Sequence, residues 1–251
     1  MSPRITPLRL EAFEQLPKHA RRCVYWEVDP STLQRPRAGG SQLSDPEFEK
    51  EAWLSMVMLE WGVCGQMAVL CPDSMGDDPV VPTGDEPCLG YAFYAPPGAV
   101  PRARRFPSGP VSADAVLLTT LGVESSDGSE ALPRTLIAAV VGDLVRRGVR
   151  ALEAFGRTAD VTDLVDPTVV SPVLQPVVDV LGDCSVDQCI LDVEFLQDAG
   201  FVVVSQHPYF PRLRLELEQG LGWKAGVEAA LERLLETAQL QQPVGAGASP
   251  R

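Results

Sequence analysis

Residues 128–156, GSEALPRTLIAAVVGDLVRRGVRALEAFG, have the order of a phosphate-binding loop that runs into a helix and then a strand. Backbone N–H groups at a helix N-terminus can donate to an anion, and the helix dipole favours negative charge there. Ser129 can donate from its hydroxyl, and Arg134 and Thr135 can reach the same anion. The segment is therefore a candidate phosphate site.

The same loop lacks the glycines that such a site commonly uses. Pro133 has no N–H to donate, Ala131 resists a positive φ, and Glu130 repels a phosphate. Proline and an acidic residue in the first turn also occur in helices that bind no ligand. Three interpretations stay open: an intact anion site, a weakened one, and a plain helix start.

The cysteines and histidines of the sequence do not have the spacing of a common metal-binding motif. The chain has two histidines, no C-x-x-C motif, and six cysteines, Cys23, Cys64, Cys71, Cys88, Cys184 and Cys189. We expect reduced cysteines that act as small buried apolar groups, with a site of four distant cysteines as the lesser alternative. His19 beside basic residues at a helix end and His207 before a proline favour structural roles. The sequence predicts no metal.

Composition narrows the possible partners. The formal net charge is −13, which argues against binding to nucleic acid because such binding needs cationic groups to neutralise phosphates. The apolar runs are too short to cross a bilayer, and the first twenty residues contain no apolar core of a signal peptide. We therefore expect a cytoplasmic protein with neither a nucleic-acid nor a membrane partner.

Hydrophobic periodicity predicts a mixed α/β chain. We expect helices at 10–22 (kinked or ended near Pro17), 45–61, 133–147 and 190–199, and strands at 66–71, 88–96, 115–123, 149–155, 201–206 and 212–217. Ser44 and Glu47 fit a capping box for the second helix, and Gly62 fits its end. Strand 115–123, its helix and strand 149–155 require a parallel pair with a crossover, whereas the last two strands should be antiparallel.

Loop composition suggests the domain organisation. Glycine, proline, serine and aspartate gather at 29–45, 72–87, 124–130 and 156–188. We predict a single domain over 1–220 with an insertion at about 156–188, an amphipathic helix over 221–240, and a disordered tail over 241–251. The apolar side of residues 223–239 leaves a homodimer open.

Three stretches together resemble the GNAT family of N-acetyltransferases. Residues 115–155 resemble its central strand, pyrophosphate loop, helix and splayed strand. FLQDAGF at 195–201 resembles its closing helix, and HPYFPRLRLEL at 207–217 is placed like its final hairpin. The resemblance covers roughly residues 5–217 and extends to uncharacterised acetyltransferase-like proteins of high-GC actinobacteria. It implies a mixed, mostly antiparallel sheet with a central parallel pair, flanked by helices.

The resemblance also implies an activity, the transfer of an acetyl group from acetyl-CoA to a small-molecule or protein amine. The family pattern (Gln or Arg)-x-x-Gly-x-(Gly or Ala) falls on Gly128, Ala131 and Pro133. The residues implied for CoA binding are Leu121, Gly122, Val123, Gly128, Ser129, Ala131, Arg134 and Thr135.

The catalytic groups of the family are incompletely matched. Leu196 stands where members often carry a tyrosine that protonates the CoA thiolate. Glu153 on the adjacent strand and Asp114 just before the central strand are the candidates for the general base. The alternative for each is an ordinary carboxylate on a solvated strand edge. These departures leave a second reading of the whole chain, a catalytically degenerate GNAT-fold protein that binds or regulates another protein.

Overall fold

The computed structural model describes residues 2–29, 45–71, 87–124, 131–164 and 186–217 of the 251-residue chain. Residues Met1–Leu217 form one compact unit, and Glu218–Arg251 fall in a second. The predicted features that lie outside the described residues are Gly128, Ser129, most of the insertion at 156–188, the helix at 221–240 and the tail at 241–251. The predicted domain organisation therefore stays a prediction.

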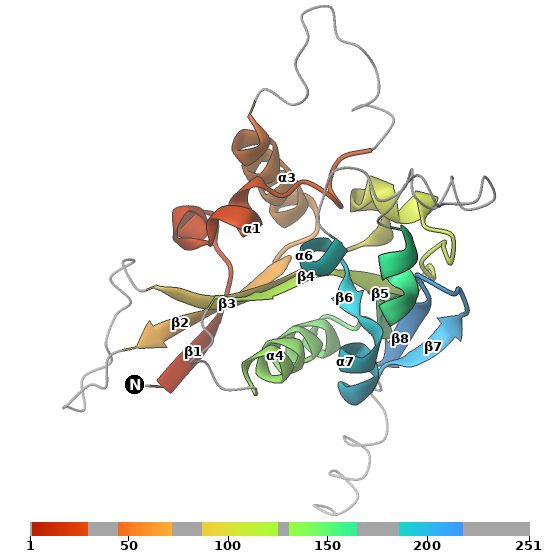
Figure 1. Cartoon of the computed structure of the whole chain (residues 1–251). Coiled ribbons are helices and arrows are strands. Elements are labelled where there is room, and N and C mark those ends of the chain that lie inside the picture. Colours follow the sequence, from red (N-terminus) through yellow and green to blue (C-terminus); the bar gives the residue numbers. More distant parts are fainter. Residues whose placement is uncertain (1, 30–44, 72–86, 125–130, 165–185, 218–251) are drawn as a thin grey trace, which may run out of the picture. The chain divides into compact units, whose positions relative to one another are not determined.

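An eight-stranded sheet forms the centre of the first unit (Figure 1). Its first four strands are antiparallel neighbours, β1 (Ser2–Pro7), β2 (Gly65–Cys71), β3 (Cys88–Ala95) and β4 (Ala115–Val123). The next strand, β5 (Ala151–Arg157), is parallel to β4. The crossover between them is the helix α4 (Leu132–Arg146), as the sequence predicts.

The sheet continues beyond β5 in antiparallel fashion. β8 (Arg212–Glu216) pairs with β5, and β7 (Val202–Ser205) pairs with β8, so the order is β1-β2-β3-β4-β5-β8-β7. A two-residue strand, β6 (Leu191–Asp192), pairs in parallel with the end of β5. The mostly antiparallel sheet with one central parallel pair confirms the predicted fold class.

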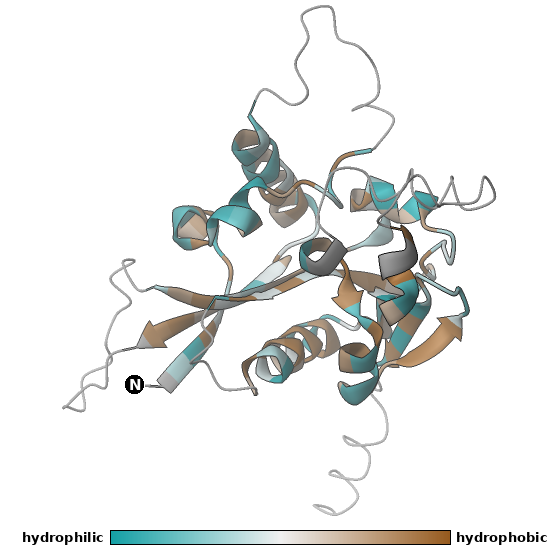
Figure 2. Ribbon diagram, viewed as in Figure 1, coloured by the Kyte–Doolittle hydropathy of each residue, from teal (hydrophilic) through white to brown (hydrophobic). Residues whose placement is uncertain are grey.

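Helices cover both faces of the sheet, and each face has its own apolar core (Figures 1 and 2). One face packs against the 3-10 helix η1 (Leu10–Gln15), α1 (Lys18–Arg22) and α3 (Pro46–Glu60). The other packs against α4 and α7 (Val193–Asp198). The remaining helices are α6 (Val186–Cys189) and the 3-10 helices η2 (Pro97–Ala99), η3 (Pro101–Arg105) and η4 (Ala159–Leu164).

The predicted helix at 10–22 ends near Pro17, as one of its two alternatives states: η1 stops before the extended Pro17, which precedes the separate helix α1. Two other predictions need correction. The helix at 190–199 begins only at Val193, since the residues before it pair with β5. Asp45 rather than Ser44 caps α3, and its carboxylate accepts hydrogen bonds from two N–H groups of the first turn.

Two further findings complete the description of the unit. The sequence does not predict strand β1, because its two prolines argue against a strand. β1 tolerates them as an edge strand that pairs only with β2. None of the helices in the described ranges has the length and hydropathy of a membrane span.

Candidate functional site

The two central parallel strands separate soon after they pair. Residues 115–117 of β4 pair with 151–153 of β5, and no pairing between these strands follows. From there β4 stays beside β3 as far as Val123, whereas β5 continues beside β8 and then beside β6. The divergence leaves a gap between two strands of one sheet, beside the start of the crossover helix.

A cleft of about 200 Å³ lies along this divergence. Four parts of the chain line it: the end of β4, the first turn of α4, the end of β5, and the stretch from α6 to α7. The lining residues are Thr120, Leu121, Val123, Pro133, Arg157, Gln188, Cys189, Ile190, Leu191, Asp192 and Phe195. Of the residues predicted to bind a cofactor, Leu121 and Val123 are therefore in the cleft wall.

Residues 188–192 form a wall of the cleft that sequence reasoning missed, and contacts from Trp26 and Arg157 hold it. The indole Nε1 of Trp26 donates to the carbonyl of Cys189 at 2.9 Å. Arg157 donates from Nε to the carbonyl of Ile190 at 3.2 Å, and its Nη1 lies 3.4 Å from a carboxylate oxygen of Asp192. The only local signal for this wall is Asp192 itself, whose side chain caps α7.

The first turn of α4 approaches the cleft with an ordinary helical backbone. Ala131 has φ −77° and ψ −19°, so the helix begins without the positive φ that a glycine would supply. Thr135 uses both its N–H and its hydroxyl to donate to the Ala131 carbonyl, at 2.9 and 2.8 Å. Because a first turn leaves its N–H groups without helical partners, Leu132 and Arg134 have donors here, and Pro133 has none.

Two other predicted binding residues have structural contacts of their own. The guanidinium of Arg134 is exposed and lies 3.4 Å from a carboxylate oxygen of Asp198 on α7. Gly122 faces the opposite side from its cleft-lining neighbours, where the Tyr91 ring packs against it. A β-carbon at this glycine would lie 2.5 Å from Cζ of that ring, so the packing requires glycine here.

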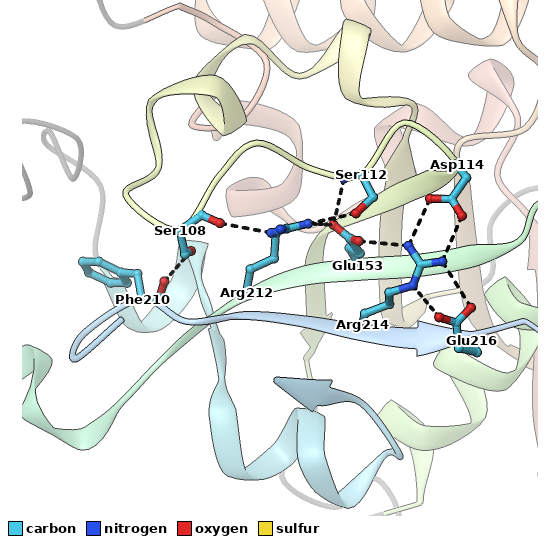
Figure 3. Close-up of polar contacts among 8 residues, drawn as sticks. All are labelled: Ser108, Ser112, Asp114, Glu153, Phe210, Arg212, Arg214 and Glu216. Carbon is cyan, nitrogen blue, oxygen red and sulfur yellow. Dashed lines mark hydrogen bonds and ion pairs between the residues drawn. The ribbon is translucent and has the colours of Figure 1, made fainter. Parts of the chain in front are cut away.

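Glu153 is fully buried beside two arginines (Figure 3). Its Oε2 accepts from Nη1 of Arg212 at 2.5 Å and from the backbone N–H of Ser112 at 3.1 Å. Its Oε1 accepts from Nη1 of Arg214 at 3.2 Å. The interpretation of Glu153 as a carboxylate on a solvated edge is therefore wrong, because both of its oxygens have internal donors.

Asp114 belongs to the same network at its exposed end. Its two carboxylate oxygens accept from both terminal nitrogens of Arg214, at 3.1 and 3.0 Å. Arg214 also contacts Glu216, and these hydrogen bonds raise the pKa of its guanidinium. The structure thus brings the two predicted bases together, one on each side of a shared arginine (Figure 3).

The charges of the network fix the ionisation of Glu153. Desolvation by itself would raise the pKa of this carboxyl, but hydrogen bonds from Ser112 and Arg212 and the charge of Arg212 outweigh it, and the pKa is lowered. The hydrogen bonds from Arg214 likewise lower the pKa of Asp114. Neither carboxylate is among the residues that line the cleft. Their role as bases stays a prediction.

Leu196, where the resembled family often has a tyrosine, and Tyr94 are both residues of the core. Leu196 is fully buried between α7 and the sheet and offers no proton. Tyr94 is also fully buried, and its hydroxyl donates to Asp143 and accepts from Gln66, each at 2.9 Å. Burial raises the pKa of the Tyr94 hydroxyl, which suits a permanent hydrogen-bond bridge between β2 and α4.

Two of the structural expectations for titratable groups can be compared with the structure. His207 has the turn role that the sequence favours, since its Nδ1 accepts from the N–H groups of Tyr209 and Phe210. The expectation of reduced cysteines holds for Cys64 and Cys88 but is wrong for Cys189, which is disulfide-bonded. The partner of Cys189 lies outside the described side chains.

Comparison with known proteins gives matches of structure only. No family model and no curated protein matches the sequence. Similar solved structures include an acetyltransferase of the GNAT family from Desulfovibrio desulfuricans, with 16% identity over 86% of this chain and 99% of that one, at a TM-score of 0.38. PaiA N-acetyltransferase from Thermoplasma acidophilum, in complex with coenzyme A, has 12% identity over 86% and 99%, at 0.45.

A third similar structure is the ribosomal-protein-S18-alanine N-acetyltransferase from Escherichia coli, with 11% identity over 88% of this chain and 97% of that one, at a TM-score of 0.42. The strand order, the central parallel pair that splays apart and the helices on both faces are those of the GNAT fold that the sequence predicts.

Proposed function

We propose that this chain is an acyl-CoA-dependent N-acyltransferase, which transfers an acetyl group from acetyl-CoA to an amine. The observation that carries the proposal is the early separation of β4 from β5, with an open cleft and a helix N-terminus beside it. A strand edge without a partner strand suits the amide groups of a pantetheine arm, which can pair with a backbone as a strand would. The sequence resemblance to the GNAT family points to the same co-substrate.

The residues of the cleft fit this co-substrate in part. The N–H groups of Leu132 and Arg134 and the exposed Arg134 guanidinium suit a pyrophosphate at the start of α4. Leu121, Val123 and Phe195 offer apolar contacts for the arm. Pro133 removes one donor, which predicts weaker binding than a glycine loop would give. At about 200 Å³ the cleft suits the narrow arm, with the nucleotide outside it.

The proposed reaction needs only displacement at a thioester. The amine nitrogen attacks the thioester carbon, the N–C bond forms, and the C–S bond breaks as the CoA sulfur leaves with the bonding pair. The amine proton passes to a base, and the CoA thiolate takes up a proton from solvent to leave as the free thiol. The acceptor is an amine of a small molecule or of a protein. The net charge of −13 favours the approach of a cationic acceptor.

Calorimetric titration with CoA and with acetyl-CoA tests the binding step. We expect saturable binding that Leu121→Trp weakens at least about tenfold, since the added ring fills the cleft. Leu59→Trp on the exposed face of α3 is the matched control and should leave binding unchanged. The proposal is overturned if millimolar ligand gives neither heat nor a thermal shift.

Release of free CoA thiol with a panel of amines tests the chemical step. Turnover that depends on the amine supports the acyltransferase. Binding of CoA without turnover over a broad panel favours the second reading, a degenerate GNAT-fold protein that regulates another protein. Pro133→Gly adds to this comparison, because a tightening of CoA binding would show that the loop is weakened by its proline.

A further inference from the structure

His19, Cys23 and Cys189 meet at the C-terminal end of α1. His19 lies in α1 and Cys23 caps its C-terminus, where the Cys23 N–H donates to the His19 carbonyl. Cys189 is 166 residues further along the chain, yet its Sγ is 3.6 Å from the Sγ of Cys23. One nitrogen of His19 and the two sulfurs all lie within 4.8 Å of one another. The fold, rather than the sequence spacing, assembles this set.

The distance between the two sulfurs is that of a tetrahedral zinc site. Zinc–sulfur bonds of about 2.3 Å at the tetrahedral angle place two thiolates about 3.8 Å apart, and a sulfur and an imidazole nitrogen about 3.6 Å apart. The Cys23–Cys189 separation of 3.6 Å is close to the first value. Two sulfurs and one imidazole also form a ligand set that binds zinc in preference to cations that favour oxygen ligands.

The imidazole offers an unpartnered nitrogen to a metal. Nε2 of His19 is buried and has no hydrogen-bond partner among the described residues, although a buried polar atom normally has one. A ring nitrogen that carries a lone pair can bind a cation. The dipole role that the sequence suggests for this histidine leaves the orphaned nitrogen unexplained.

We propose that the reduced protein binds one Zn²⁺ through His19, Cys23 and Cys189. The site shares Cys189 with the wall of the cleft proposed for CoA, and it goes against the sequence-based expectation of no metal. It would tie α1 to the wall of the cleft, because Cys189 lines that wall. The charge of the cation would also offset the repulsion between the two thiolates that the fold brings together.

Formation of the site requires prior reduction, because Cys189 is disulfide-bonded. A dithiol reductant supplies two electrons and two protons to that bond and leaves two thiols, with the reductant oxidised to its own disulfide. Zn²⁺ then displaces the thiol protons of Cys23 and Cys189 into solvent, and His19 contributes a lone pair without losing a proton.

Cobalt substitution of the full-length reduced chain tests the proposal directly. After reduction, removal of the reductant without oxygen, and addition of Co²⁺, we expect a thiolate-to-cobalt charge-transfer band and the visible bands of tetrahedral cobalt, both abolished by Zn²⁺. Metal analysis should find about one ion per chain. Cys23→Ser, Cys189→Ser and His19→Gln should each lower bound metal to below about a tenth of that value.

Cys64→Ser and Cys88→Ser are the matched controls, since both are buried thiols outside this set and should keep full binding. Circular dichroism checks that each variant folds, and the spectrum of the unmodified chain serves as a readout that needs no variant. The proposal is overturned if the reduced chain binds no cobalt, if the bands lack thiolate character, or if folded Cys23→Ser and Cys189→Ser variants bind as well as the controls.

Discussion

Replacing Glu153 by glutamine separates a structural role for this residue from the catalytic one. The substitution keeps the size of the side chain but removes the buried negative charge between Arg212 and Arg214. It also turns one acceptor oxygen into a donor that faces a guanidinium. We expect the folded protein to lose stability because two cations then share a buried region without their common anion.

The surrounding contacts set the size of the effect. Removing one partner of a buried ion pair costs about 3–5 kcal/mol. Here Arg212 keeps acceptors on Ser108 and Ser112, and Arg214 keeps two exposed carboxylates, so the arginines are not left without partners. We therefore expect a loss of about 2–4 kcal/mol in the free energy of unfolding. For a unit of this size, that corresponds to roughly 4–16 °C in Tm.

Urea unfolding at several pH values provides the assay, and the change of the stability difference with pH gives a second, independent test. The pKa of Glu153 is lowered below its ordinary value of 4.5, so its contribution to stability is complete above that pH. The contribution is lost as the pH falls through the folded-state pKa, because the carboxyl then protonates. The difference in unfolding free energy between wild type and Glu153→Gln should therefore be constant near pH 7 and should shrink below about pH 4.5.

A different result would support the catalytic interpretation. If Glu153→Gln unfolds at the same urea concentration as wild type at pH 7 while amine-dependent turnover disappears, the structural argument for this residue is refuted. If turnover survives in the fraction that stays folded, Glu153 does not act as the base. Arg212→Lys is a useful companion, since it keeps the charge but not the geometry of the contacts with Glu153 and Ser108.

Two further substitutions test the packing around the sheet. Gly122→Ala should cost about 1–3 kcal/mol, because its β-carbon meets the buried ring of Tyr91, whereas Gly98→Ala, with no atom within 4 Å, should be nearly neutral in the same thermal melts. Tyr94→Phe should cost about 1–3 kcal/mol in urea unfolding, since it leaves two buried hydrogen-bond partners without the hydroxyl; an unchanged midpoint would show that water replaces it.

Regular elements of this fold are predictable from local pattern. Strand β4 and helix α4 match their expected ranges to within a residue, because an apolar run and a wide apolar helix face are strong short-range signals. Strand β1 was missed because it pairs on one side only and carries prolines at both ends of its core. The predicted helix at 190–199 starts too early, because residues 191–192 pair with β5 and this pairing overrides local helical preference.

The candidate site is less predictable, because tertiary contacts decide what its residues do. Glu153 lies on a strand with ordinary alternation, and only the arrival of β8 beside it supplies the two arginines. Arg134 and Thr135 have the right chemistry for an anion, yet one is paired with α7 and the other bonds within its own helix. Residue type thus limits what each position can do, and the packed neighbours select among those options.

The wall at residues 188–192 shows most clearly how this selection works. Three contacts that hold it come from distant parts of the chain: Trp26 from the region after α1, Arg157 from the end of β5, and Cys23 through sulfur contact. Because β6 has only two residues, these contacts and the disulfide of Cys189 contribute to the position of the wall. The width of the cleft is consequently set by the packing of α1 as well as by the separation of the two parallel strands.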